Sequence, residues 1–344
     1  MHMAAMIVRV AIFGSSGFVG AELLRLCAGH PHFRPVSLFG DSQAGTPLDK
    51  VHPQLALAHP GAMVERYESG ALDDVDLVFA ALPHGESQKL AGEIVDRGLA
   101  FVDLGADFRL RDADDYARWY GEKHQAPELL DRFVYGIPEI DRTAVREARF
   151  VAAAGCYPTA AILALKPLVD AGLVDPDTII VDAASGVTGA GRGLKESTHF
   201  NSVAESFSAY GLLNHRHTAE MEAALGARVL FTPHLAPMNR GILATCYADA
   251  AGAIDADAPL AALRAAYAAE PFVHVTEQPP ATKWTLGSNS VQLTARYDAR
   301  TGRVLAIAAL DNLVKGAAGQ MVQCANLMLG LDETAGLAVA GVCP

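Results

Sequence analysis

The sequence predicts an α/β fold in two domains: a parallel, doubly wound sheet, then an α+β domain with a mostly antiparallel sheet. A chain of 344 residues is long enough for two hydrophobic cores. Strands and helices alternate up to about residue 150, as in a parallel sheet. Later strands follow one another without helices between them, which favours antiparallel pairing. We expect a first domain over 1–150, joined by a returning C-terminal helix over 314–344, and a second domain over 151–313.

The expected elements of the first domain follow from apolar runs and turn residues. Apolar, β-branched runs predict buried strands, and helical spacing of apolar residues between them predicts helices. A glycine closes the second of these helices. The strands are expected at 7–13, 33–40, 74–83 and 99–105, and the helices at 21–30 and 86–98.

The second domain is predicted from runs of apolar residues, several of them alternating with polar ones. Helices are expected after Tyr157, after His217 and in the Ala-rich stretch 250–269. An apolar helix over 314–330 would pack back on the first domain. The strands are expected at 178–185, 228–235, 241–250, 271–278, 290–298 and 304–312.

Composition excludes several classes of function. The formal net charge of −12 argues against non-specific nucleic-acid binding. No apolar run is long enough to span a bilayer, and the N-terminus lacks the order of a signal peptide. The five cysteines are odd in number and form no CxxC pair, so neither a disulfide framework nor a metal site is expected. We expect a cytoplasmic protein.

A glycine turn between the first strand and the first helix predicts a dinucleotide site. In "GSSGFVG", Gly14, Gly17 and Gly20 let backbone N–H groups approach a pyrophosphate, which the helix N-terminus also favours. The spacing alone is a weak signal, but its place between strand and helix supports a Rossmann fold. The remaining candidate cofactor contacts in this turn are Ser15, Ser16, Phe18 and Val19.

The turn after the second strand bears on which dinucleotide binds. Asp41 lies about twenty residues after Gly20, where a carboxylate would accept a hydrogen bond from the ribose 2′-hydroxyl and favour NAD. Ser42 and Gln43 could instead donate to a 2′-phosphate. Residues 36–45 contain no arginine, so the local signal for NADP is thin.

Cys156 is a candidate nucleophile. In "GCYPTAAILAL", Pro158 suits the first turn of a helix, which puts Cys156 at or just before the helix N-terminus. The helix dipole there stabilises a thiolate and lowers a thiol pKa that is ordinarily about 8.5. The other interpretation, a small buried hydrophobe, fits Cys27, Cys246 and Cys324 better.

A thiolate chemistry also needs a base and an anion-binding group. His199, His215, His217 and His234 are candidate bases, and "NHRHTAEME" places two of them beside Arg216 just before a helix. The residue types alone do not choose between His215 and His217. Arg109, after the fourth strand, suits a phosphate or carboxylate.

Together these groups predict the reduction of an acyl phosphate. The loop "DAASGVTGAGRG" at 182–193 has four glycines that would let the backbone approach the cofactor. A thiolate would attack the carbonyl carbon and expel phosphate, leaving a thioester. Hydride from a nicotinamide would reduce the thioester to a thiohemiacetal, which collapses to an aldehyde.

The chain resembles the N-acetyl-γ-glutamyl-phosphate reductases of arginine biosynthesis, which are related to the aspartate-semialdehyde dehydrogenases. The resemblance runs in family order from about residue 8 to 335, and "GCYPTA", "HRHTAE" and "FTPHLAPMNRGIL" are its most specific motifs. The other matching motifs are "GSSGFVG", "DLGADFRLRD", "VYGIPEI", "SGVTGAGR", "ESFSAYG" and "DNLVKGAAGQ". It implies a Rossmann domain plus a catalytic and dimerisation domain, assembled as a homodimer or homotetramer.

The resemblance also implies roles for individual residues. It implies Cys156 as nucleophile, His217 as acid/base and Arg109 for the substrate phosphate, with NADPH as hydride donor. Further substrate-binding candidates are Arg216 and Tyr210. The cofactor candidates beyond the glycine turn are Ser42, Ser185, Gly186 and Asn312.

Three other interpretations compete with this one. A reductase of carrier-protein-bound glutamyl phosphate in lysine synthesis would favour a basic docking face, which the acidic composition disfavours. Aspartate-semialdehyde dehydrogenase itself is disfavoured by "HRHTAE" and "GCYPT". A non-catalytic dinucleotide sensor is disfavoured by an intact Cys156 and His217.

Overall fold

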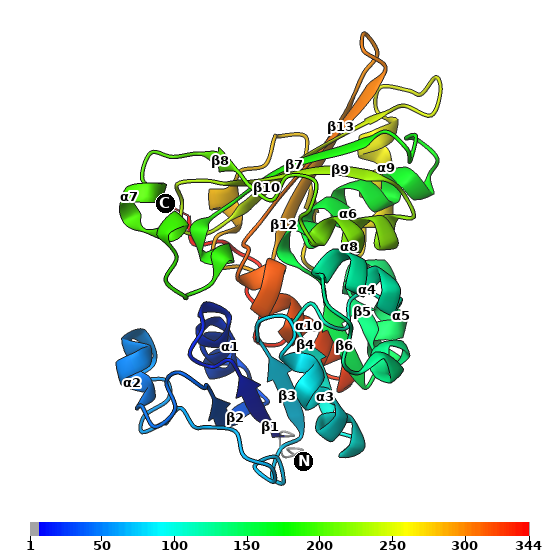
Figure 1. Cartoon of the computed structure of the whole chain (residues 1–344). Helices are drawn as coiled ribbons and strands as arrows, with labels where there is room; N and C mark the ends of the chain where they lie inside the picture. Colours follow the sequence, from blue (N-terminus) through cyan, green and yellow to red (C-terminus); the bar gives the residue numbers. More distant parts are fainter. Residues whose placement is uncertain (1–6, 344) are drawn as a thin grey trace, which may run out of the picture. The chain divides into compact units, whose positions relative to one another are not determined.

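A computed structural model of the chain describes residues 7–343, which form two compact units (Figure 1). The first unit comprises the described residues up to 117, together with 122–154 and 317–337. The second comprises 118–121, 155–316 and the segment from 338 onward. The chain leaves the first unit slightly later than the predicted boundary at 150, because strand β6 (Phe150–Ala153) pairs with strand β4 (Ala100–Asp103) in the first unit's sheet.

The first unit is built on a six-stranded sheet in the order β2-β1-β3-β4-β6-β5, with every neighbouring pair parallel. This confirms the predicted doubly wound sheet. The two strands that were not predicted, β5 and β6, are short. The other strands are β1 (Val8–Phe13), β2 (Phe33–Phe39), β3 (Leu77–Ala80), β4 (Ala100–Asp103) and β5 (Val134–Gly136).

Helices cover both faces of this sheet, because successive strand residues point to opposite sides. Val10 and Ile12 of β1 join one apolar cluster, and Ala11 and Phe13 join the other. The first cluster includes residues of α1 and α10, and the second includes residues of α3. The helices are α1 (Phe18–Gly29), α2 (Leu48–Val51), α3 (Ser87–Asp96), α4 (Ala113–Tyr120), α5 (Pro138–Glu147) and α10 (Gly319–Met328), with 3-10 turns at Pro53–Leu55 and Pro127–Arg132.

The second unit contains a seven-stranded sheet in the order β11-β12-β13-β10-β7-β9-β8. Four neighbouring pairs are antiparallel, and β7–β9 and β11–β12 are parallel, which confirms the predicted mostly antiparallel sheet. The strands are β7 (Ile179–Ser185), β8 (Ser208–Ala209), β9 (Val229–Leu235), β10 (Ile242–Asp249), β11 (Val273–Val275), β12 (Val291–Asp298) and β13 (Arg303–Leu310).

Helix α6 (Cys156–Asp170) is the central helix of the second unit, buried along most of its length against the sheet. Strand β10 alternates, with Ile242, Ala244 and Cys246 buried and Leu243 and Tyr247 half-buried, so the other sheet face is only partly covered. The remaining helices are α7 (Phe200–Val203), α8 (His217–Leu225) and α9 (Ala258–Ala266), with 3-10 turns at Val187–Ala190, Glu196–Thr198 and Thr282–Thr285.

The C-terminal region differs from the predicted single helix that returns to the first domain. Residues Val314–Ala318 form a π-helical turn, and α10 begins at Gly319. The last segment belongs to the second unit, because Asn289 N–H donates to the Ala338 carbonyl (2.8 Å) and Val342 N–H to the Leu286 carbonyl (2.8 Å). Among the described residues, no helix combines the length and apolar character needed to cross a membrane.

Candidate active site

Cys156 is the first residue of α6, as predicted, and Gly155 is its N-cap in an extended conformation. The side chain is half-buried, at the end of the helix where N–H groups point outward and favour a thiolate. Burial instead raises the pKa of the Cys27 and Cys246 thiols to about 12. Of these three cysteines, only Cys156 lies in a setting that favours the reactive thiolate.

A buried carboxylate ties the cysteine turn to helix α8. The Gly155 N–H donates to Glu220 Oε2 at 3.1 Å, and Glu220 is 4% exposed. His217 is the first residue of α8, and a spacing of three residues puts it on the same helix face as Glu220. Sequence reasoning missed Glu220, although its spacing from His217 in "HRHTAE" was a usable signal.

An aromatic cluster surrounds the residue after the nucleophile. The Tyr157 ring centroid lies 5.8 Å from that of His215, 6.0 Å from His217 and 5.3 Å from Phe231. The Tyr210 hydroxyl donates to the Tyr157 hydroxyl at 3.2 Å. The structure therefore brings Tyr210 and both candidate histidines to the helix end that carries Cys156.

His215, the first histidine of "HRHT", lies in surroundings that disfavour its charged form. Burial, and then the positive charge of Arg216, lower the pKa of His215 to about 4. His215 Nδ1 accepts a hydrogen bond from the His217 backbone N–H at 3.2 Å. A histidine that stays neutral at pH 7 is a poor general acid, so His215 is suited to holding the start of α8. Of the other two candidates, His234 stacks on Phe207 (5.1 Å between centroids) and His199 precedes α7.

Arg216 is exposed, and its guanidinium carbon lies 5.1 Å from the centroid of the Tyr120 ring. This is within the range of a cation–π contact. The contact orients the guanidinium without burying it, so the charge remains available to an anionic substrate.

The candidate cofactor residues of the second unit form a packed loop junction. A Cβ on Gly186 would lie 2.5 Å from the Asn239 carbonyl oxygen, so only glycine fits there. Asn312 is buried; its amide donates to Thr188 Oγ1 (3.0 Å) and accepts from Gly241 N–H (2.8 Å). The Ser185 hydroxyl donates to the Gly186 carbonyl at 3.0 Å. These three residues hold the shape of the 186–188 loop.

In the first unit, the glycine turn divides into packed positions and an open one. Gly14 has φ +77°, and a Cβ there would lie 2.3 Å from the Ala81 carbonyl oxygen. A Cβ on Gly20 would lie 2.3 Å from the Gly14 carbonyl oxygen, and Ser15 is buried with its hydroxyl donating to the Phe39 carbonyl (3.1 Å). Gly14, Ser15 and Gly20 therefore hold strand and helix together.

Gly17 occupies the open position of the turn. A Cβ there would meet only the Gly14 carbonyl oxygen, at 3.3 Å, which is closer than ordinary contact but far looser than the 2.3 Å approaches at Gly14 and Gly20. No side chain caps α1, which begins at Phe18, within the part of the chain that the structure describes. An open backbone at an uncapped helix N-terminus fits a pyrophosphate. The other predicted contacts, Ser16 and Val19, are neighbours in this turn.

Arg109 lies in a buried polar region that begins at the end of β4. Its side chain is 9% exposed, and Nη2 donates to the Leu104 carbonyl. Asp103 is fully buried; its Oδ1 accepts from the Ser87 hydroxyl (2.6 Å) and Gly105 N–H (2.9 Å). Burial raises the pKa of the Asp103 carboxyl to about 7, and the charge of Arg109 opposes this shift. Arg109 is thus a positioned, partly desolvated cation in the first unit.

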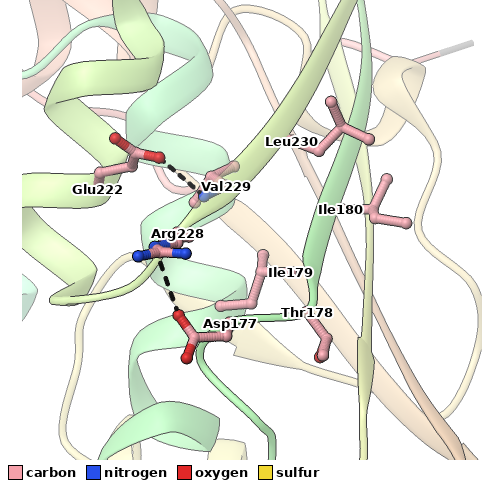
Figure 2. A pocket seen from close by; sticks show the side chains of 8 residues that line it. All are labelled: Asp177, Thr178, Ile179, Ile180, Glu222, Arg228, Val229 and Leu230. Carbon is pink, nitrogen blue, oxygen red and sulfur yellow. Dashed lines mark hydrogen bonds and ion pairs between the residues drawn. The ribbon is translucent and has the colours of Figure 1, made fainter.

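Asp41 and Ser42 are exposed in the turn that follows β2. Elsewhere, a hollow of about 430 Å³ lies at the starts of β7 and β9. Figure 2 shows the side chains that line it. Its lining contains no residue predicted for the site; Arg228 lies 3.6 Å from Asp177, and Glu222 accepts from Val229 N–H. Among the described residues, no group of three histidine, cysteine or acidic side chains is placed to hold a metal ion.

Comparison with known proteins decides the family. The semialdehyde dehydrogenase NAD-binding domain matches residues 9–148, and the semialdehyde dehydrogenase dimerisation domain matches residues 156–312. The N-acetyl-gamma-glutamyl-phosphate reductase of Desulforudis audaxviator is 48% identical over 98% of this chain and all of the relative. The chain belongs to the N-acetyl-gamma-glutamyl-phosphate reductase family.

Other relatives support the same assignment. The Jannaschia sp. reductase is 47% identical over 98% of this chain and 99% of its own. Among solved structures, aspartate semialdehyde dehydrogenase II of Vibrio cholerae has a TM-score of 0.72 at 18% identity, covering 95% of this chain and 99% of that one. The Candida albicans enzyme, solved with NADP, has a TM-score of 0.71 at 15% identity, covering 94% and 98%. These two structures support the fold, and the family makes the chain an oxidoreductase.

Proposed function

We propose that this chain reduces N-acetyl-γ-glutamyl phosphate to N-acetylglutamate 5-semialdehyde and phosphate, with NADPH as donor. The observation that carries the proposal is the junction of two helix starts in the second unit. Cys156 begins α6, His217 begins α8, and Glu220 joins the two through the Gly155 N–H at 3.1 Å. The proposed substrate is taken from the names of the relatives, which are N-acetyl-gamma-glutamyl-phosphate reductases.

Cys156 carries the covalent steps. Its thiolate attacks the acyl carbon, the bond from that carbon to the phosphate oxygen breaks, and phosphate leaves with the electron pair. When bound, the reduced nicotinamide supplies a hydride to the resulting thioester. The thiohemiacetal oxygen then loses its proton, the C–S bond breaks, and Cys156 leaves as a thiolate while the aldehyde forms.

His217 manages the protons of the thiohemiacetal, as acid when its oxygen is protonated and as base when it collapses. His215 remains neutral and positions the first turn of α8 through the His217 N–H. Arg109, Arg216 and Tyr210 are the proposed substrate-binding groups. The two arginines suit the phosphate and carboxylate charges of this substrate.

The first unit holds the cofactor in this proposal. The backbone from Gly14 to Gly20 accommodates the pyrophosphate, and Ser42 donates to the 2′-phosphate. In the second unit, Ser185, Gly186 and Asn312 shape the loop on the nicotinamide side. The NAD-binding domain match and the NADP complex of the Candida albicans structure support a nicotinamide dinucleotide.

A second copy of this chain is the expected partner. The half-buried sheet face in the second unit carries Leu243 and Tyr247 of β10 and Leu305 and Ile307 of β13, an apolar surface suited to self-association. The matched dimerisation domain supports a homo-oligomer. Sedimentation velocity distinguishes a dimer or tetramer from a monomer. The free cysteines among the described residues are in keeping with a cytoplasmic location.

The competing functions receive less support. The relatives described above are named for the acetylated substrate, so a carrier-protein-bound substrate is not favoured. A non-catalytic sensor would not need the junction of Cys156, Glu220 and His217.

The reaction run in reverse tests the proposal. Purified protein should reduce NADP⁺ with N-acetylglutamate semialdehyde only when phosphate is present. Cys156→Ser should lose this activity and form no acyl adduct with the acyl phosphate, while still binding NADPH. Cys343→Ser, at an exposed cysteine, is the matched control and should behave as wild type. A Cys156→Ser variant that keeps more than about a tenth of the wild-type kcat would refute the assignment, because a hydroxyl is a far weaker nucleophile.

A further inference from the structure

The turn after β2 lies against a segment that is distant in sequence and has no regular structure. Phe39 forms a parallel bridge with Glu65. Gly40 N–H donates to the Glu65 carbonyl at 3.0 Å, and Gly45 N–H to the Val64 carbonyl at 2.7 Å. These backbone bonds fix the residues around 65 beside the turn that contains Asp41 and Ser42.

The segment brings a guanidinium to Asp41. Arg66 Nη2 lies 3.4 Å from Asp41 Oδ1, and the two side chains are 70% and 91% exposed. The arginine that the sequence lacks within 36–45 is therefore supplied from outside that stretch. Because both groups are well hydrated, the ion pair is weak, and Arg66 can exchange its partner at little cost.

The same turn also touches the glycine turn of the dinucleotide site. A Cβ on Gly40 would lie 3.1 Å from Ser16 Oγ, so the backbone after β2 packs closely on the turn that begins α1. In a Rossmann unit, the end of the second strand is where the ribose 2′ position is recognised. Arg66 thus lies beside the turn at which a Rossmann unit recognises the ribose 2′ position, the turn that contains Asp41 and Ser42.

We propose that Arg66 determines specificity for the 2′-phosphate of NADPH, an inference that rests on the proposed function. A phosphate carries more charge than the Asp41 carboxylate and accepts two parallel N–H bonds from one guanidinium. The guanidinium leaves its single contact with Asp41 and binds the phosphate, with the Ser42 hydroxyl as a second donor. Without a 2′-phosphate, Arg66 stays with Asp41, and the ribose hydroxyl gains nothing from it.

A pair of cofactor fragments tests this directly by binding, without turnover. Adenosine 2′,5′-bisphosphate and 5′-AMP differ only in the 2′-phosphate, and calorimetry on the full chain gives Kd for each. Arg66→Gln should weaken binding of the bisphosphate about ten- to a hundredfold, the equivalent of about one lost charged hydrogen bond. The Kd of Arg66→Gln for 5′-AMP should change less than twofold. Asp41→Asn should bind the bisphosphate more tightly than the wild type does.

The matched control is Arg9→Gln, because Arg9 is another arginine in a surface ion pair; its side chain is 43% exposed and its Nη1 lies 2.7 Å from Asp74 Oδ1. It should leave both Kd values unchanged. The inference is overturned if Arg66→Gln weakens binding of the bisphosphate no more than the control does, or weakens binding of both fragments equally. A wild type that turns over NADPH in preference to NADH while Arg66→Gln has no effect would refute only the role of Arg66. A wild type that binds both fragments equally would refute the NADPH proposal and this inference together.

Discussion

Gly316 is the position at which a single methyl group should most directly disturb the nucleophile. It lies in the π-helical turn Val314–Ala318, and a Cβ there would be 2.8 Å from Cys156 Cβ and 3.3 Å from Cys156 Cα. A Leu310 methyl would also be 3.3 Å away. π-Helical turns are often found at functional sites, and here the turn lets the chain pass directly over the cysteine.

The contact distances give the size of the effect. Ordinary contact begins at 3.4 Å, so Gly316→Ala must push Cys156 Cβ away by about 0.6 Å, or distort the turn by as much. A misplacement of about 1 Å can cost about a hundredfold in rate, so we expect kcat to fall about ten- to a hundredfold. Overpacking of this kind also costs about 1–3 kcal/mol of unfolding free energy.

Three measurements on the same preparation separate these effects. They are kcat in the reverse reaction, the rate of Cys156 alkylation by iodoacetamide at fixed pH, and Kd for NADPH. We expect kcat to fall, the alkylation rate of Cys156 to change and Kd for NADPH to stay constant. Gly92→Ala is the control, because Gly92 lies in α3 and a Cβ there would meet nothing within 4 Å. A Gly316→Ala variant with more than half the wild-type kcat and an unchanged alkylation rate would show that the cysteine does not depend on this contact.

Two further predictions concern titrating groups. His217→Ala should lower kcat by about 10²–10⁴ and His215→Ala by less than about tenfold, because a neutral His215 cannot donate the proton. The reverse order of effects would contradict the assignment. NMR should find no titration of His215 between pH 5 and 8. Because burial raises the pKa of Asp103 to about 7, stability from this group is complete below about pH 4 and is lost as the pH rises through 7. Between pH 5 and 8 the wild type should therefore lose about 3 kcal/mol more unfolding free energy than Asp103→Asn, measured by urea denaturation; parallel losses would show that Asp103 is already ionised at pH 5.

Local patterns in the sequence predicted much of the fold. The first strand, glycine turn and first helix were predicted because each depends on neighbours in the chain, and β1 and α1 lie where expected. The π-helical turn was missed, since apolar spacing does not distinguish it from the helix that follows. Strands β5 and β6 were missed because runs of three and four residues carry too little periodicity.

The candidate site was only partly predictable, because its decisive features depend on contacts between distant residues. Cys156 was predicted from its helix start. The residue types alone left His215 and His217 open; the resemblance implied His217, and the low pKa of the buried His215 supports the same choice. The position of Arg66 could not be predicted from the sequence for another reason. Its segment has no strand or helix pattern, and backbone hydrogen bonds to the turn after β2 decide where it lies.

The exposed pair of Asp41 and Arg66 makes cofactor choice easy to alter in evolution. Substitutions at such hydrated positions usually change stability by less than about 0.5 kcal/mol, so they rarely threaten the fold. Such a substitution could change the preference between NADPH and NADH strongly, although it would lower the free energy of unfolding only slightly. The nucleophile junction is different, because Glu220 is buried and Gly316 is packed against Cys156. Lineages can therefore adapt to their supply of reduced nucleotide while the acyl chemistry stays unchanged.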